Sequence, residues 1–224
     1  MGVVVLASGG LDSAALIGEE ARAGRDVFPL FLSCGMVWER AELAALRRFL
    51  KALPGPIARR VRPLKVAALP MKDLYGGHWS VTGNGVPGWR ASDNSVYLPG
   101  RNIGLLAKGA VYAALMGVPR VAVGVLKGNS FPDASSRFLK SFERSLAQGL
   151  DFPVVLAAPF LKLHKEDVIR RASDLPLHLT LSCSSPRGAA GSPCLRCAKC
   201  RERVLAFGPD RGSGLRPSSR SSIA

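Results

Sequence analysis

Two groups of residues in this chain have types and spacings that suit chemistry. The first is Ser8-Gly9-Gly10-Leu11-Asp12-Ser13, which joins an apolar run to a segment with helical periodicity. Its glycines let backbone N–H groups approach an anion without hindrance from a Cβ atom, and a helix N-terminus adds the positive end of its dipole. Ser8 and Ser13 add hydroxyl donors. The string therefore predicts a binding site for a phosphate or pyrophosphate group.

The second group consists of four cysteines with the spacing C-x10-C-x2-C-x2-C: Cys183, Cys194, Cys197 and Cys200. Two residues between thiolates let one tight turn present both sulfur atoms to an ion, and four thiolates complete a closed tetrahedral Zn²⁺ site. We expect Lys199, Arg196 and Arg201 to offset the negative charge of such a site. An iron–sulfur cluster or unliganded thiols are the alternatives. The fifth cysteine, Cys34, is predicted to be a small buried apolar residue.

The elements that must position these groups are buried strands alternating with helices. Apolar and β-branched runs predict strands, and a 3.6-residue period predicts helices. The strands are expected at 3–6, 27–32, 61–68, 120–126 and 153–157, and the helices at 11–23, 38–50, 101–116, 133–148, 165–172 and 201–207. This order predicts an α/β fold: a doubly wound, mainly parallel, five-stranded Rossmann-like sheet that binds ligands beyond the carboxyl ends of its strands.

The predicted organisation has three parts. Residues 1–175 form the α/β domain, with a Gly-, Asn-, Ser- and Trp-rich loop insertion at 71–96; residues 176–207 form the cysteine segment; and residues 208–224 are predicted to be a disordered tail. Long loops often serve as lids or binding loops. For Trp38, Trp79 and Trp89, stacking on a flat base and anchoring of the core both stay open.

The chain is strongly basic. It contains 31 Lys and Arg against 16 Asp and Glu, a formal net charge of +15 with a pI near 10.4. Such a balance favours a polyanionic partner: nucleic acid, a nucleotide phosphate or an acidic membrane surface. The apolar content of 47% argues against a disordered chain, and no apolar run of about 20 residues predicts a membrane span. With no signal-peptide pattern, we expect a cytoplasmic protein with reduced thiols.

The glycine string resembles the PP-loop, SGGxDS, of the ATP pyrophosphatases, and its place between a strand and a helix fits that motif. The alternative is an ordinary Gly-rich turn with a Ser cap. The resemblance implies that ATP activates a substrate by adenylation and releases pyrophosphate. It places Asp12 near phosphates bound to Mg²⁺. It assigns ATP contacts to the loop and the start of the helix, namely Ala7, Ser8, Gly9, Gly10, Leu11, Asp12, Ser13, Ala14, Ala15, Leu16 and Ile17.

A second string, Val96-Tyr97-Leu98-Pro99-Gly100-Arg101-Asn102, resembles the VPGRN signature of the 7-cyano-7-deazaguanine synthase family (QueC, also called ExsB). Phe131-Pro132-Asp133, Pro159-Phe160 with Lys165, and Thr180-Leu181-Ser182-Cys183 match that family further, in its order. The resemblance covers about residues 3–207. It implies an ATP-dependent carbon–nitrogen ligase. Such an enzyme adenylates 7-carboxy-7-deazaguanine on its carboxylate, lets ammonia form the amide, and activates the amide to leave the nitrile.

Four residues are the catalytic candidates: Asp12, Arg101, Asp133 and Lys165. The planar fork of Arg101 suits a carboxylate or a phosphate. Asp133 is expected to hydrogen-bond a purine-like N–H edge, to cap the following helix, or both. Lys165 either contacts a phosphate or is solvated.

One stretch departs from the family. After its second strand the family has an Asp-Tyr-Gly-Gln-Arg-His-like string, where this chain has Ser33-Cys34-Gly35-Met36-Val37-Trp38-Glu39-Arg40 and then Glu42 as the acidic match. Another carboxylate or amide therefore stays open as the substrate. A PP-loop tRNA-modifying enzyme, which the charge would suit, and a non-enzymatic nucleotide-binding subunit are the alternative functions. The predicted partners are a deazapurine carboxylate and ammonia, with nucleic acid second and no membrane; a homodimer is left open.

Overall fold

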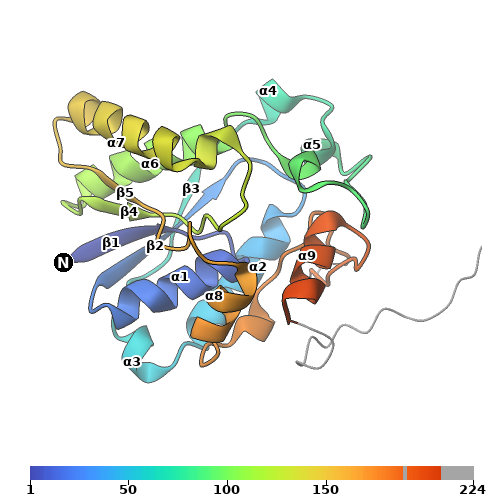
Figure 1. Ribbon diagram of the computed structural model, residues 1–224, viewed down its shortest axis with the longest axis horizontal. Helices are drawn as coiled ribbons and strands as arrows, with labels where there is room; N and C mark the ends of the chain where they lie inside the picture. The colour runs from blue at the N-terminus through green and yellow to red at the C-terminus, as the bar shows by residue number, and fades with distance from the viewer. Residues whose placement is uncertain (189–190, 208–224) are drawn as a thin grey trace, which may run out of the picture.

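The structure is a computed structural model that describes residues 1–188 and 191–207, and it contains the expected five-stranded parallel sheet (Figure 1). The predicted tail lies outside these residues. The strands are β1 (Gly2–Leu6), β2 (Asp26–Ser33), β3 (Lys65–Ala68), β4 (Arg120–Ala122) and β5 (Val155–Ala157), in the order β3-β2-β1-β4-β5. Because the chain winds outward from β1 first through β2 and later through β4, the switch point lies at the carboxyl end of β1.

The helices form a layer on each face of the sheet, with a third group beyond its ligand edge (Figure 1). One face is covered by α1 (Leu11–Arg22), α2 (Glu39–Lys51), α3 (Gly55–Ala58), α8 (Lys165–Arg171) and the 3₁₀ helix η3 (Leu177–Leu179). The other is covered by α6 (Arg101–Leu115) and α7 (Ser136–Leu150). The remaining elements are α4 (Lys72–Tyr75), α5 (Trp79–Thr82), η1 (Asp93–Val96), η2 (Pro132–Ala134) and α9 (Ala198–Phe207).

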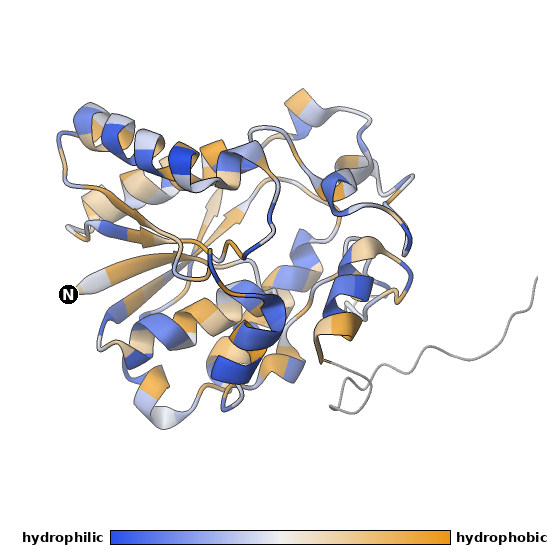
Figure 2. Cartoon of the chain, in the orientation of Figure 1, coloured by the Kyte–Doolittle hydropathy of each residue, from blue (hydrophilic) through white to orange (hydrophobic). Residues whose placement is uncertain are grey.

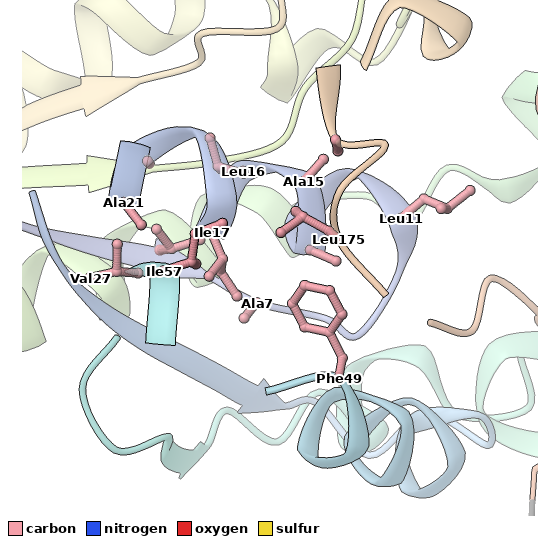
Figure 3. Close-up of a cluster of buried hydrophobic side chains, with 14 of the residues drawn as sticks. Ala7, Leu11, Ala15, Leu16, Ile17, Ala21, Val27, Phe49, Ile57 and Leu175 are labelled. Atoms are coloured by element: carbon pink, nitrogen blue, oxygen red, sulfur yellow. The ribbon is translucent and has the colours of Figure 1, made fainter. Parts of the chain in front are cut away.

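The sheet is buried on both faces, which is why its strands are continuous apolar runs rather than alternating ones. In β1, Val3 and Val5 join the core on the α1 face, whereas Val4 and Leu6 join the core under α6 and α7. Figure 2 shows the strands mostly in hydrophobic colour and the outer helix faces in hydrophilic colour. On the α1 face, Phe49 of α2 is directed at the side chains of α1 (Figure 3).

Several elements differ from the sequence-based expectation; the strand expected at 120–126, for example, ends at Ala122. The third strand is shortened to Lys65–Ala68, because Pro63 has no N–H for the ladder and Val61 keeps only an isolated bridge to Val27. The insertion at 71–96 is not a plain loop, since it forms the single-turn helices α4 and α5 and the turn η1. The last helix begins at Ala198 rather than at residue 201, directly after Cys197.

A side-chain cap and a glycine mark the starts of helices α7 and α6. Ser135 caps α7, because its Oγ accepts a hydrogen bond from the Phe138 N–H at 3.2 Å. Gly100, with φ of 75°, precedes α6 and lets the chain turn sharply into Arg101. Among the residues that the structure covers, no helix is both long and apolar enough to cross a bilayer.

Candidate functional site

A cleft lies at the carboxyl ends of β1, β2 and β4, where the strand order predicts a ligand site. Three adjoining cavities of about 270, 260 and 220 Å³ make up this cleft. All three are lined by Asp12, Val96, Phe131 and Lys199, so they are chambers of one site. The glycine string, the PGRN string and α9 thus meet in the same place.

The glycine string forms a tight turn that its own serines stabilise. The Ser8 N–H donates to Ser13 Oγ at 3.2 Å, and the Gly10 N–H donates to Ser8 Oγ at 3.2 Å. Ser13 Oγ in turn donates to the Gly10 carbonyl at 3.1 Å. Helix α1 then begins with no side-chain cap on its first N–H groups. A turn of this kind leaves the helix N-terminus open toward an anion.

Gly9 is required by the fold as well as by the turn. Its φ is 87°, and a Cβ at this position would lie 2.3 Å from the carbonyl oxygen of Glu42 in α2. On the opposite side, a Cβ on Gly124 would come within 3.1 Å of the Asp12 backbone. These two glycines let α2 and the segment after β4 approach the string closely.

Ten of the eleven residues at 7–17 for which ATP contacts were predicted separate into two sets, and Gly9 is the glycine packed against Glu42. Ala7, Ser8, Gly10, Asp12 and Ser13 line the cleft. The other set points away from it and packs in the core, at 2% exposure or less: Leu11, Ala14, Ala15, Leu16 and Ile17. The inward face of α1 is occupied by packing against the sheet and α2, so the side chains of this second set are not part of the cleft lining, and ATP contacts through their backbone stay a prediction.

A chain of charged groups crosses the cleft. Lys165 Nζ lies 3.2 Å from Asp12 Oδ2 and also pairs with Glu202 of α9, whose other oxygen lies 2.9 Å from Lys199 Nζ. Burial opposes the charge of Lys165, but the carboxylates of Asp12 and Glu202 raise its pKa. Lys165 is therefore a buried ammonium group, with its side chain 10% exposed, rather than a solvated one.

Asp12 and Arg101 each carry a buried polar atom that lacks a partner within the described residues. These atoms are Asp12 Oδ1 and Arg101 Nε, and both residues line the cleft. A buried polar atom without a hydrogen bond is costly and is usually satisfied by a ligand, an ion or water. The two atoms therefore mark where a cation would meet Asp12 and where an acceptor would meet Arg101.

Glu42 is the acid on the α2 side of the same cleft. Burial raises its pKa to about 8, although the Arg101 guanidinium acts in the opposite direction. A carboxyl group with this pKa exchanges its proton near neutral pH, as a general acid or base must.

Asp133 lies one layer behind the cavity wall. It is 4% exposed, and its two carboxylate oxygens accept hydrogen bonds from the Asn102 side chain at 3.1 Å and from the Asn102 backbone N–H at 3.3 Å. Burial raises the pKa of Asp133, while these hydrogen bonds lower it. Asp133 is not among the residues that line the cleft, so its position does not support the direct substrate contact expected from the sequence. It holds Asn102, which does line the cleft.

The tryptophans divide between two places. Trp38 and Trp79 stack on each other with ring centroids 5.5 Å apart and form part of the cleft wall. Trp89 instead packs against the cysteines. The loop before Trp38 is held by Glu39, whose carboxylate accepts hydrogen bonds from the Cys34 N–H at 2.8 Å and the Gly35 N–H at 2.9 Å. The divergent segment after β2 is therefore an ordered part of the wall.

Four buried thiols stand together at the far end of the cleft: Cys183, Cys194, Cys197 and Cys200. Their sulfur atoms all lie within 4.8 Å of one another, and those of Cys194 and Cys200 are 3.9 Å apart. A tetrahedral site with Zn–S bonds of about 2.3 Å places its sulfurs about 3.8 Å apart. The cluster therefore has the donor set and the size for a zinc ion. Cys34, by contrast, is fully buried in a separate apolar cluster.

The insertion is tied to the cysteine segment. Gly88 bridges to Cys197, and the Arg201 guanidinium donates to the carbonyls of Trp89 at 2.7 Å and Ala91 at 2.8 Å. Arg201 also pairs with Asp93 at 2.7 Å. Lys199 and Arg201, which were expected to offset the charge of the thiolates, thus form ion pairs with Glu202 and with Asp93 of the insertion; their effect on the thiolates stays a prediction.

Sequence reasoning missed three participants in the cleft: Gly124, Lys199 and Glu202. The glycine follows a strand at the ligand edge, which is a signal that could have been used. Lys199 and Glu202 are three residues apart on a helix and so lie on one face of it. No sequence signal indicated that this face meets the glycine string.

Comparisons with known proteins find relatives over nearly the whole chain. The family described as "Queuosine biosynthesis protein QueC" matches residues 2–209. The 7-cyano-7-deazaguanine synthase 1 of Desulfitobacterium hafniense is 32% identical over 212 residues, covering 92% of this chain and 90% of that protein. The 7-cyano-7-deazaguanine synthase of an Anaeromyxobacter species is 33% identical over 219 residues, covering 92% of this chain and 93% of that protein.

Two solved structures share the architecture. A predicted subunit of a tRNA methyltransferase from Methanocaldococcus jannaschii has a TM-score of 0.50 and 17% identity, over 77% of this chain and 74% of its own. A 4-thiouridine synthetase in complex with RNA and ATP has a TM-score of 0.55 and 16% identity, over 91% of this chain and 48% of its own. At these identities the likeness shows the fold alone, and it confirms the predicted α/β architecture.

Proposed function

The chain belongs to the family of queuosine biosynthesis proteins QueC, and from this premise we propose that it is an ATP-dependent carbon–nitrogen ligase that makes 7-cyano-7-deazaguanine. Its substrates are a 7-carboxy-7-deazaguanine-like carboxylate, ATP and ammonia. One observation carries the proposal: the glycine string, Arg101 and the buried Lys165 all face one cleft at the switch point of the sheet.

The glycine string holds the phosphates of ATP in this proposal. The open N-terminus of α1 and the Gly10 turn present N–H groups and a positive dipole end to the β- and γ-phosphates. The ammonium of Lys165, kept charged by Asp12 and Glu202, adds a fixed positive charge. Both features stabilise the negative charge that develops on the departing pyrophosphate.

Asp12 is the residue that would hold Mg²⁺. Its Oδ1 is buried without a partner, and a carboxylate oxygen is a ligand that Mg²⁺ prefers. The ion would neutralise charge on the phosphates and orient them. The residues present fit the ion, since Oδ2 stays paired to Lys165 while Oδ1 is left for coordination.

Arg101 orients the carboxylate of the substrate. A carboxylate is a poor electrophile, so one of its oxygens must first attack the α-phosphorus of ATP, expelling pyrophosphate and forming an acyl adenylate. Ammonia then adds to the acyl carbon, AMP leaves, and one proton is released with the amide. We assign this proton to the ionised form of Glu42, because a pKa of about 8 makes its carboxylate a stronger proton acceptor than an ordinary one.

The same groups serve the second activation. The amide oxygen attacks a second ATP, pyrophosphate leaves, and loss of AMP with the two amide protons gives the nitrile. The Trp38–Trp79 pair supplies a flat apolar wall for the ring of the substrate. Asn102, held by Asp133, supplies a polar edge.

We also propose that the four cysteines hold one structural Zn²⁺ in a reducing, cytoplasmic setting. Four thiolates leave no open position for water, so the ion would stabilise the segment and not take part in the chemistry. Metal analysis of the purified chain tests this: one zinc per chain is expected, and iron with a visible absorption band would contradict it.

The activity test uses the purified chain with ATP, Mg²⁺, ammonium and 7-carboxy-7-deazaguanine. Mass spectrometry should detect first the amide and then the nitrile, with two AMP formed for each nitrile. AMP release that needs tRNA, or that occurs with another carboxylate and not with this one, would contradict the proposal. An Arg101→Gln variant is the matched control, because it keeps a polar side chain but removes the charge.

A further inference from the structure

Helix α9 belongs to the cysteine segment, yet it carries two charged side chains into the nucleotide cleft. Lys199 stands between the ligand candidates Cys197 and Cys200, and it lines all three chambers of the cleft. Glu202 follows on the same helix and lines the two chambers that also contain Lys165. A segment placed by its cysteines therefore contributes to the wall of another site.

The contacts of Glu202 connect two cations that would otherwise repel each other. One carboxylate oxygen lies 2.9 Å from Lys199 Nζ, and the other pairs with Lys165 Nζ. Lys165 also lies 3.2 Å from Asp12 in the glycine string. The carboxylate of Glu202 therefore stands between two ammonium groups at the edge of the proposed phosphate site.

We propose that Lys199 is an additional phosphate-binding residue and that Glu202 is the positioning residue that holds Lys199 and Lys165 toward the triphosphate of ATP. This inference rests on the proposed function, because it takes ATP as the ligand of the cleft. It makes the cysteine segment a part of the nucleotide site and not merely a structural appendage.

Charge arithmetic favours a ligand role for this group. The network contains two ammonium groups and the carboxylates of Asp12 and Glu202, so it is neutral before any ligand binds. Asp12 would hold a divalent ion through its unpartnered Oδ1, and the site would then gain positive charge facing the glycine string. An ammonium group has three donors, and Lys199 uses one on Glu202. Its remaining donors are available to phosphate oxygens.

The alternative is that the Glu202 pairs serve only to fix α9. Other contacts already do so: Arg203 donates to Thr180 Oγ1 at 2.7 Å and to the Leu177 carbonyl at 3.1 Å, and Arg201 binds the insertion. The Glu202 side chain is 34% exposed and the Lys199 side chain 41% exposed. A partly exposed pair such as Glu202–Lys199 contributes little to stability, so fold maintenance does not account for it.

The test measures the dissociation constant of ATP with Mg²⁺ by calorimetry on the full chain, without the acid or ammonia. Glu202→Gln should weaken ATP binding about tenfold and Lys199→Gln about fivefold, as expected for loss of charge-assisted hydrogen bonds. Glu19→Gln is the matched control, because Glu19 has the same 34% side-chain exposure and pairs with Arg171 at 3.7 Å outside the cleft lining. It should bind ATP as the parent chain does.

A kinetic measurement separates positioning from damage to the fold. Lys199→Gln should raise KM for ATP with kcat changed less than twofold, whereas partial unfolding would lower kcat at constant KM. Zinc content should stay at the parent value in both variants. Unchanged ATP affinity in both variants, or loss of metal in Glu202→Gln, would overturn the inference. Failure of the parent chain itself to bind ATP would instead overturn the proposed function.

Discussion

Asp133 and Asn102 join two signature strings that lie 31 positions apart in the chain. The Asp133 carboxylate accepts from both the side chain and the backbone N–H of Asn102, at 3.1 and 3.3 Å. Because Asn102 is in the first turn of α6, this pair fixes the start of the helix and the direction of Arg101 beside it. Asp133 of the Phe131-Pro132-Asp133 string therefore affects the cleft indirectly, by holding Asn102 at the start of α6.

Replacement of Asp133 by Asn should disturb both residues. The variant keeps the size of the side chain but places an amide against the Asn102 donors, so one hydrogen bond to a charged acceptor is lost. Such a bond contributes about 1.5–3 kcal/mol, which corresponds to roughly a 10- to 100-fold loss in kcat/KM for the acid. Steady-state assays check this.

A double-mutant cycle with Asn102→Ala isolates the pair. The effects of the two single variants on kcat/KM should not add, because both remove the same interaction. Strict additivity would show that Asp133 and Asn102 act independently.

The raised pKa of Glu42 predicts that the free energy of unfolding depends on pH. Its pKa is raised from 4.5 to about 8 in the folded state, so between these values the folded chain binds a proton that the unfolded chain does not. The free energy of unfolding should therefore fall as pH rises through this window. Glu42→Gln removes this loss and should be more stable than the parent chain by up to about 4 kcal/mol at pH 8 and by only about 1 kcal/mol near pH 5. Urea unfolding at both pH values measures it, and equal differences would contradict the assignment.

Removal of metal should loosen the insertion as well as the cysteine segment. Chelation, or Cys197→Ser, takes away the ion that is proposed to hold the bridge between Cys197 and Gly88 and the neighbouring Arg201 contacts. Hydrogen exchange should then rise over residues 86–93 and 194–203, while β1 and α1 stay protected. Cys34→Ser is the control, because this cysteine lies in a separate cluster and should leave exchange in those two segments unchanged.

A substitution in the Trp38–Trp79 pair is expected to change KM for the 7-carboxy-7-deazaguanine substrate and not KM for ATP. Trp38→Phe replaces a two-ring side chain by a single ring. The ring overlap with Trp79 and the flat surface in the cleft therefore decrease. An aromatic pair contributes about 0.5–1.5 kcal/mol, so KM for the acid should rise roughly 2- to 10-fold while KM for ATP is unchanged. Trp89→Phe, placed against the cysteines, is the comparison variant. An equal rise in both KM values would exclude a ring-stacking role.

The sequence patterns located most elements, for reasons visible in particular residues. The Val3–Leu6 run is buried on both faces, and the apolar spacing from Leu11 to Ile17 matches one buried face of α1. Helices α4 and α5 are single turns, too short for a helical period to show in the sequence. Pro63 marked the weakness of the third strand, but only the structure shows where pairing resumes.

The cleft was predictable where a motif fixes local geometry, and not where distant segments meet. The glycine string holds its own turn through Ser8 and Ser13, so its shape follows from adjacent residues. The same motif gave no means of separating cleft residues from core residues such as Leu16. Glu202 reaches Lys165 only because the cysteine segment folds back over α8, a long-range contact that no local spacing encodes.

The charge network has a consequence for the order in which the site comes into being. Asp12 is made within the first dozen residues, whereas Lys199 and Glu202 belong to the final described helix. Synthesis runs from the amino end, and domains generally fold as units as they emerge from the ribosome. A growing chain thus displays its glycine string long before the opposing cations exist. The nucleotide site can therefore be completed only after α9 has been synthesised and has folded against the glycine string.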